Sequence, residues 1–241
     1  MKLQTCSDIT KSTPIKKEKK RIYLIIISIA ILCFQILYYQ LTLVFIQFVA
    51  KLIPELSNNC YLMIHHIFQF LLLFIPTILI NKYTSVDFGY HIKEWKKGIK
   101  WFLIGVIFEI AVAVVLTILY GGSAEIFSID SLIFQLFFSG LGEEICYRSL
   151  PLVTMFWLCG DIEIKISHKL KIDIAVIISA LFFSAGHISF QFGYSGISYS
   201  WTQLIVTFVI GIILGMMYRK TNSVWACMTA HGIYNVIAIL T

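Results

Sequence analysis

The sequence predicts an all-α, polytopic membrane protein: a helix bundle with about seven transmembrane helices (six to eight). Of the 241 residues, 59% are hydrophobic and only 13% are charged, whereas soluble domains carry about 25% charged residues. The apolar residues also gather in long runs, and roughly 20 such residues are needed to cross a bilayer. These runs are residues 22–50, 60–81, 101–120, 131–158, 174–190, 202–218 and 223–240.

The polar start of the chain is expected to be a basic cytoplasmic tail. Residues 1–21 precede the first apolar run and end in the basic segment KKEKKR. That run is longer than the apolar region of a removed signal peptide, which has about 7–15 residues. No polar stretch between the later runs is long enough for a soluble domain, so residues 22–241 are expected to form a single membrane domain.

The net charge of +6 is interpreted as a topology signal, and nucleic-acid binding is not expected. Cytoplasmic loops of membrane proteins are rich in Lys and Arg. With the N-terminus inside, the basic segments 82–100, 165–171 and 219–220 all face the cytoplasm, and the outer loops 121–130 and 191–201 carry no basic residue. This asymmetry predicts a cytoplasmic N-terminus. The predominance of Lys over Arg favours a bacterial cell membrane.

Ionisable side chains inside the apolar runs are the candidates for a functional site, since each costs at least roughly 2.5–3.5 kcal/mol at the bilayer centre. The fourth run contains Glu143, Glu144 and Arg148. Glu144 and Arg148 are four residues apart, so they share a helix face and can pair. One arginine cannot neutralise two carboxylates, and the remaining carboxylate is a candidate general base. The alternative is a structural ion network that locks helices together.

Two later runs supply histidines. His187 follows Phe183 by one helical turn, and His231 precedes Asn235 by one turn. The N–H groups of His231 and Asn235 could serve as oxyanion donors, although either histidine alone could be a structural hydrogen-bonding residue. At 1.5 Å per residue, Glu143, His187 and His231 all lie roughly 12–21 Å from a membrane surface. This overlap in depth favours one shared polar site.

Three further ionisable residues lie in earlier runs. Glu109 is expected at a depth close to that of Arg148, and we expect it to be a second partner of that arginine. His65 and His66 lie in a run rich in Phe and Leu, without a nearby carboxylate. They are interpreted as packing or pore-facing residues.

Three motifs occur in order along the chain: EExxxR (143–148), FxxxH (183–187) and HxxxN (231–235). Together they resemble the CPBP family of intramembrane proteases, also called the CAAX-protease, bacteriocin-processing or Abi family. The resemblance covers about residues 85–241, which is therefore the expected catalytic motif region. It implies peptide-bond hydrolysis inside the membrane.

The resemblance also implies a role for each motif residue. Glu143, with His187, would activate a water for attack on the scissile carbonyl. His231 and Asn235 would hold the oxyanion of the tetrahedral intermediate. No Ser or Cys is placed beside these residues in a nucleophile–base pattern, so direct attack by water is favoured over an acyl-enzyme.

The remaining motif residues, Glu144 and Arg148, would orient the site, and Glu144 could share the role of base. A zinc ion held by Glu143, His187 and His231 is the alternative, because two histidines and a glutamate can form a zinc site with an open position. The sequence lacks HExxH, so a mechanism without a cofactor is favoured.

Two other classes of function are considered. One is a membrane scaffold or bacteriocin-immunity protein that binds a membrane partner without catalysis; the other is a small transporter or channel. The chain has no inverted repeat and its polar residues gather in the C-terminal half, which disfavours a transporter. For a protease, the expected partners are the lipid bilayer and a peptide or protein substrate: a prenylated CaaX protein, a leader peptide, a pheromone precursor or a bacteriocin. No pattern specifies an oligomeric state.

Overall fold

The computed structural model describes most of the chain from Lys17 onward. The described residues are 17–83, 86–92, 94–120, 128–159, 162–167, 170–189 and 197–240. Most of the predicted basic tail, residues 1–16, lies outside this part of the chain, as do residues 121–127 and 191–196 of the two predicted outer loops.

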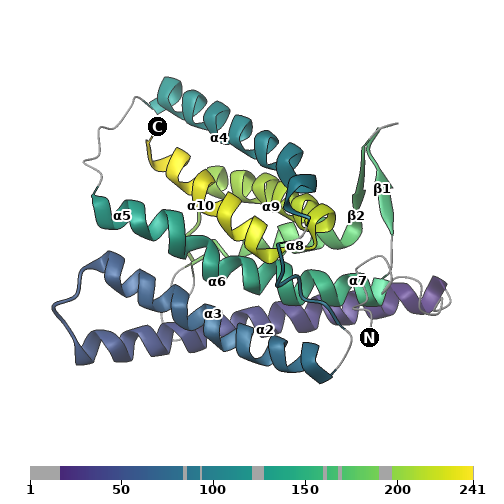
Figure 1. The fold of residues 1–241 in the computed structure, drawn as a ribbon, viewed down its shortest axis with the longest axis horizontal. Helices are drawn as coiled ribbons and strands as arrows, with labels where there is room; N and C mark the ends of the chain where they lie inside the picture. Colours follow the sequence, from purple (N-terminus) through teal and green to yellow (C-terminus); the bar gives the residue numbers. More distant parts are fainter. Residues whose placement is uncertain are drawn as a thin grey trace.

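The described residues form seven helical segments at the positions of the seven apolar runs, and this confirms the predicted all-α membrane helix bundle (Figure 1). Six of these segments are α2 (Lys17–Leu52), α3 (Asn58–Tyr83), α4 (Ile99–Tyr120) after the short helix η1 (Trp95–Gly98), α8 (Ile174–Ala185), α9 (Trp201–Thr221) and α10 (Val224–Leu240). The seventh, here called the central helix, is continuous through α5 (Ile129–Ile133), η2 (Phe134–Ser139), α6 (Gly140–Glu144), η3 (Ile145–Leu152) and α7 (Val153–Cys159).

Four helices in the described residues are long and apolar enough to cross a bilayer: α2, α3, α4 with η1, and α9. The helices α8 and α10 are also apolar but have only 12 and 17 residues. At 1.5 Å per residue, α8 is roughly 18 Å long and ends inside the hydrocarbon layer if it begins at the membrane surface. The short α8 therefore brings the chain that follows it, including His187, to the middle of the bundle.

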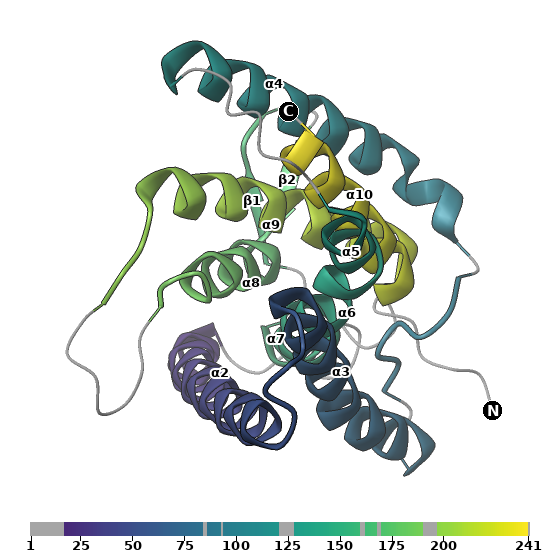
Figure 2. The same cartoon turned by 90° about the vertical axis from the view of Figure 1, so that its left-hand side faces the viewer.

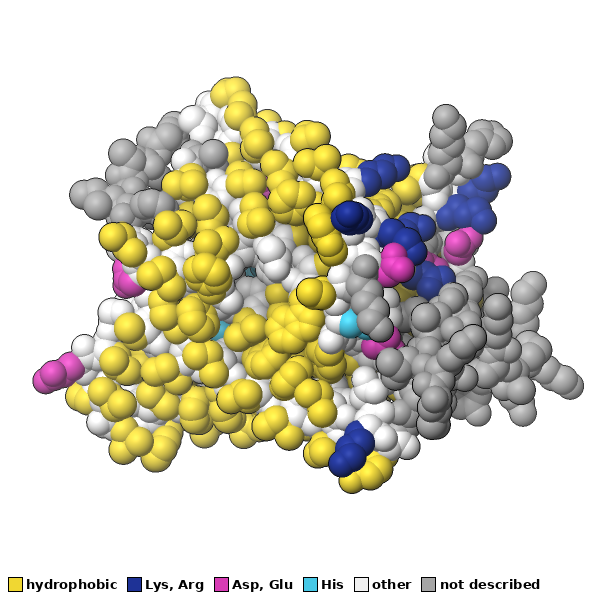
Figure 3. All heavy atoms as spheres, in the orientation of Figure 1, with side chains coloured by type: hydrophobic (Ala, Val, Ile, Leu, Met, Phe, Trp, Pro, Cys, Tyr) yellow, Lys and Arg dark blue, Asp and Glu magenta, His cyan; other side chains and the backbone are white. Residues whose placement is uncertain are grey.

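Successive helices run antiparallel, so the connections gather at two ends of the bundle (Figure 1). One end holds the hairpin of β1 (Glu163–Lys165) and β2 (Lys171–Asp173) and the connection between α9 and α10. Basic side chains gather at this end, while hydrophobic side chains cover the middle of the visible face (Figure 3). Large apolar residues are frequently exposed on α2, α3 and α4. The middle of the bundle therefore has the surface expected of a protein that faces lipid there.

The central helix lies between α3 on one side and α10 on the other (Figure 2). Glycines permit both close approaches. A Cβ atom on Gly142 would overlap Gln69 of α3, and one on Gly232 of α10 would overlap the carbonyl oxygen of Leu136 in the central helix. The central helix is thus packed closely from two sides between residues 136 and 142.

Two π-helical turns, η2 and η3, interrupt the α-helical hydrogen bonding of the central helix. They flank the five-residue α6, which contains Glu143 and Glu144. Such π-helical turns are rare and frequently occur at functional sites, because they change which side chains share a face. Pro151 lies within η3, and its missing N–H removes one helical hydrogen bond.

The loop before η1 forms hydrogen bonds with the connection between α9 and α10, at the end of the bundle where the basic side chains gather. Asn222 ends α9 in the left-handed conformation, with φ of 46°, and donates a hydrogen bond from Nδ2 to Asp87 Oδ2 at 2.8 Å. Asp87 Oδ1 also accepts from Gly89 N, and Gly89 O accepts from Val224 N at the start of α10. The Asp-Phe-Gly segment therefore fixes the turn between α9 and α10, and with it the direction of α10.

Candidate active site

The two adjacent glutamates of the central helix have different surroundings. The side chain of Glu144 has no exposed surface, whereas that of Glu143 is 26% exposed. Glu144 Oε1 lies 2.8 Å from His231 Nδ1, and Glu144 Oε2 lies 3.2 Å from Arg148 Nε. Glu144 is therefore held between a histidine and an arginine, and Glu143 is the glutamate that a ligand can reach.

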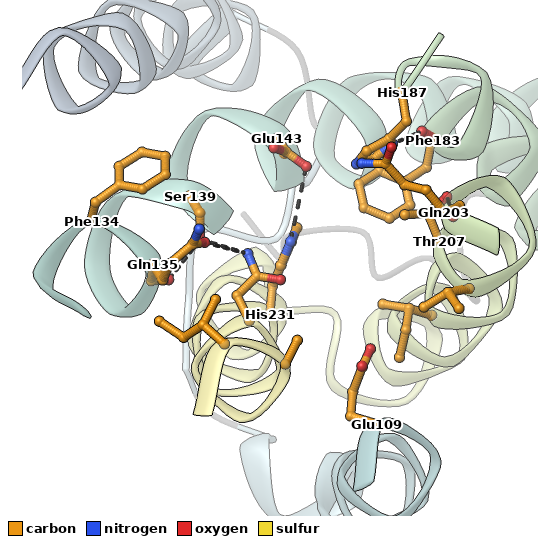
Figure 4. A pocket seen from close by; sticks show the side chains of 15 residues that line it. Glu109, Phe134, Gln135, Ser139, Glu143, Phe183, His187, Gln203, Thr207 and His231 are labelled. Atoms are coloured by element: carbon orange, nitrogen blue, oxygen red, sulfur yellow. Dashed lines mark hydrogen bonds and ion pairs between the residues drawn. The ribbon is translucent and has the colours of Figure 1, made fainter. Parts of the chain in front are cut away.

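Glu143 lines a cavity of about 390 Å³ between the central helix, α4, α9 and α10 (Figure 4). His187, His231 and Asn235 line the same cavity. Four of the six predicted site residues therefore share one cavity, and the other two, Glu144 and Arg148, lie buried directly behind it.

His231 connects the two glutamates. Its Nδ1 bonds to Glu144, and its Nε2 lies 3.9 Å from Glu143 Oε2. A carboxylate accepts hydrogen bonds, so the Glu144 contact places a proton on Nδ1. When His231 is protonated on both nitrogens, Nε2–H points toward Glu143 and the cavity.

His187 lies two residues beyond the end of α8. It was expected inside a helix extending to residue 190, but the helix ends at Ala185 and His187 occupies the turn that follows. Gly186 favours this ending because glycine is a poor helix former. His187 Nδ1 lies 2.9 Å from the carbonyl oxygen of Phe183, and as donor of that hydrogen bond it leaves Nε2 as a proton acceptor.

The ring of Phe183 holds the cationic and imidazole groups of the site together. It is 1% exposed, and its centroid lies 4.4 Å from the Arg148 guanidinium carbon. The rings of His187 and His231 pack edge-on against it, with centroids 5.0 and 5.6 Å away. An aromatic face over a buried guanidinium adds a cation–π attraction, so the FxxxH motif positions more than its own histidine.

Asn235 differs from the simplest form of the predicted oxyanion donor. Its amide donates to Gln135 Oε1 at 3.1 Å and to Ser139 Oγ at 2.9 Å, which uses both amide hydrogens. Ser139 Oγ in turn donates to the carbonyl oxygen of Gln135. Ser139 is thus held by an amide and a carbonyl, with no histidine or carboxylate as a partner of its hydroxyl among the described residues.

Gln135 and Ser139 were not identified from the sequence, although both line the cavity. The signal was present: Gln135, Ser139 and Glu143 follow one another at intervals of four residues, which places polar groups along one helix face. The interval was missed because neither residue is ionisable.

Glu109 is buried and lines the cavity from α4 (Figure 4). The structure shows no ion pair between Glu109 and Arg148 among the described residues, so the expected partnership is not observed. Within the same residues, no group of three or more His, Cys, Asp or Glu side chains is arranged to hold a metal ion. Glu143, His187 and His231 therefore do not form the zinc ligand set considered from the sequence.

Comparison with known protein families finds a similarity over the C-terminal half of the chain. A family model for type II CAAX prenyl endopeptidases, described as Rce1-like, matches residues 125–237. This match confirms the resemblance predicted from the three motifs, and it indicates an intramembrane protease. No curated protein and no solved structure matches the chain.

Proposed function

We propose that the protein is an intramembrane endopeptidase in which Glu143, together with His187, activates a water molecule. The observation that supports this assignment most directly is the division between the two glutamates: Glu144 is buried and paired, while Glu143 is accessible in the cavity. The proposed mechanism uses only water and the side chains of the site.

In this mechanism, the water oxygen attacks the carbonyl carbon of the scissile peptide bond as its proton passes to Glu143. His231, protonated on both nitrogens, donates from Nε2–H to the resulting oxyanion. Asn235 would be the second donor. One of its amide hydrogens would leave Gln135 or Ser139 and bond to the oxyanion instead. The proton held by Glu143 then passes to the leaving amine as the C–N bond breaks.

We further propose that the basic end of the bundle faces the cytoplasm, because Lys and Arg are enriched on that side of membrane proteins. The described basic residues at this end include Lys165, Lys171 and Arg219. Composition favours a bacterial cell membrane. The proposed substrate is a peptide or a membrane-associated protein. CaaX-type C-terminal tripeptides and leader peptides are the candidates to test first.

The test compares peptides released from membranes that carry equal amounts of the wild-type protein or Glu143→Gln, by mass spectrometry with and without a chelator. Glu55→Gln is the matched control, because Glu55 is exposed in the loop between α2 and α3. We expect one or more products to disappear only with Glu143→Gln, irrespective of chelator. Unchanged products together with a lost cellular phenotype would instead favour a non-catalytic scaffold.

A further inference from the structure

A second cavity lies on the opposite side of the central helix from the first. Its volume is about 210 Å³, and it is lined by residues of α2, α3, the central helix and the turn after α8. Glu143 and His187 line both cavities. The helices α2 and α3 precede residues 125–237, which match the family model. The N-terminal helices therefore give the candidate base a second set of neighbours.

The walls contributed by α2 and α3 are polar and incompletely satisfied. Four buried side-chain atoms that belong to lining residues have no hydrogen-bond partner in the described part of the chain: Gln35 Nε2, His65 Nε2, His66 Nδ1 and Gln69 Oε1. The side chains of Gln35, His66 and Gln69 are among the buried polar groups, at 7–8% exposed. Buried polar groups in native proteins are almost always bonded to protein or to ordered water. A polar ligand is therefore needed in this cavity.

The chemistry of the lining favours water over an anionic group. The unpartnered atoms comprise an amide donor, an amide acceptor and two imidazole nitrogens, so they offer both directions of hydrogen bonding. No Lys or Arg lines this cavity, and Glu143 does. A substrate carboxylate would meet a like charge without a compensating cation. The volume holds several waters, because one water occupies about 30 Å³ in the liquid.

We propose that this second cavity holds the water that supplies the hydrolytic nucleophile to Glu143 while the substrate occupies the first cavity. His65, His66, Gln35 and Gln69 are positioning residues for that water. This inference rests on the proposed peptidase function. It explains why α2 and α3 bury Gln35, His66 and Gln69 and place the half-buried His65 beside them: these side chains solvate a small aqueous compartment inside the bundle.

The first experiment detects the water directly and does not require activity. X-ray footprinting of the full-length protein in lipid nanodiscs oxidises side chains that lie beside bound water, and mass spectrometry locates the products. We expect Tyr38, a lining residue that is 6% exposed, to be oxidised at least about tenfold faster than Tyr234, which is 1% exposed and lines neither cavity. Equal, slow oxidation of both tyrosines would show that the cavity is dry and would overturn the proposal.

The second experiment measures hydrolysis of a peptide whose cleavage depends on Glu143. His65→Phe removes the ring nitrogens and His65→Gln keeps a polar group. Since the substrate lies in the other cavity, His65→Phe is expected to lower kcat at least about tenfold with KM within about twofold of the wild type, and His65→Gln to restore most of the rate.

Thr42→Val is the matched control, because Thr42 is buried in α2, donates within its own helix and does not line the cavity. A raised KM with unchanged kcat for His65→Phe would make the cavity a substrate subsite and overturn the proposal. Unchanged kcat and KM would overturn it as well. Failure of the peptidase proposal itself would appear separately, as products that persist in Glu143→Gln.

Discussion

The buried pair of Glu144 and Arg148 permits a quantitative test of how the site is held. Both side chains have no exposed surface. Removal of one partner from a buried ion pair leaves an uncompensated charge and costs about 3–5 kcal/mol. Arg148→Met keeps an unbranched side chain of similar length, so most of the loss reports the charge rather than a cavity.

The surroundings place the expected value at the lower end of this range. Glu144 keeps its 2.8 Å hydrogen bond to His231 in the Arg148→Met variant, and this contact compensates part of the charge. We therefore expect a loss of about 3 kcal/mol in the free energy of unfolding, roughly a 150-fold change in the equilibrium constant. Glu144→Gln added to Arg148→Met removes the buried charge and keeps an acceptor for His231, so the double variant should regain at least about 1–2 kcal/mol.

The assay is equilibrium unfolding of the full-length protein in detergent micelles, followed by intrinsic tryptophan fluorescence. Lys97→Met is the control, because the Lys97–Glu94 pair is 62% and 49% exposed and exposed pairs contribute little. The reasoning is refuted if Arg148→Met is destabilised by less than about 1 kcal/mol, or if the double variant is no more stable than the single one.

Two further predictions concern other parts of the bundle. Gly232→Ala places a Cβ against the carbonyl oxygen of Leu136 and should destabilise the protein by at least about 1–3 kcal/mol; unchanged thermal unfolding would contradict this close crossing. Hydrogen bonds from Ser128 and Asn59 lower the pKa of Asp130. The ionised Asp130 carboxylate therefore stabilises the folded protein at pH values above the ordinary aspartate pKa, and this stabilisation is lost as the pH falls through the lowered pKa. Asn59→Ala should raise this pKa in an NMR titration of labelled aspartate.

The sequence was sufficient to predict the helix bundle and four site residues that line its first cavity: Glu143, His187, His231 and Asn235. Apolar runs of about 20 residues report helices in lipid, because a helix of that length spans the bilayer and satisfies its backbone hydrogen bonds within the segment. The motif residues Glu143, His187 and His231 could be singled out because ionisable groups are rare in such runs. Their roles depend on side-chain contacts, and only the structure separates the accessible Glu143 from the buried Glu144.

Spacing alone could not predict where helices break. The apolar run 174–190 continues past the point where α8 ends, because hydrophobicity does not distinguish a helix from the buried turn at Gly186 and His187. The π-helical turns of the central helix were also unpredictable from periodicity, although they determine which residues share a face with Glu143. Asn235 is an example: its amide donates hydrogen bonds to Gln135 and Ser139. Neither of these residues is ionisable, so a search for ionisable groups in apolar runs does not find them.

His65 and His66 were interpreted as packing or pore-facing residues because no carboxylate lies near them in the sequence. Contacts between distant segments could not be predicted from spacing alone. In the structure the missing carboxylate comes from the central helix: both histidines and Glu143 line one cavity. His66 also packs edge-on against Phe134, with ring centroids 5.2 Å apart, so it has a packing contact as well as a polar one. The α3 helix therefore forms part of the surroundings of Glu143, although it lies outside all three sequence motifs.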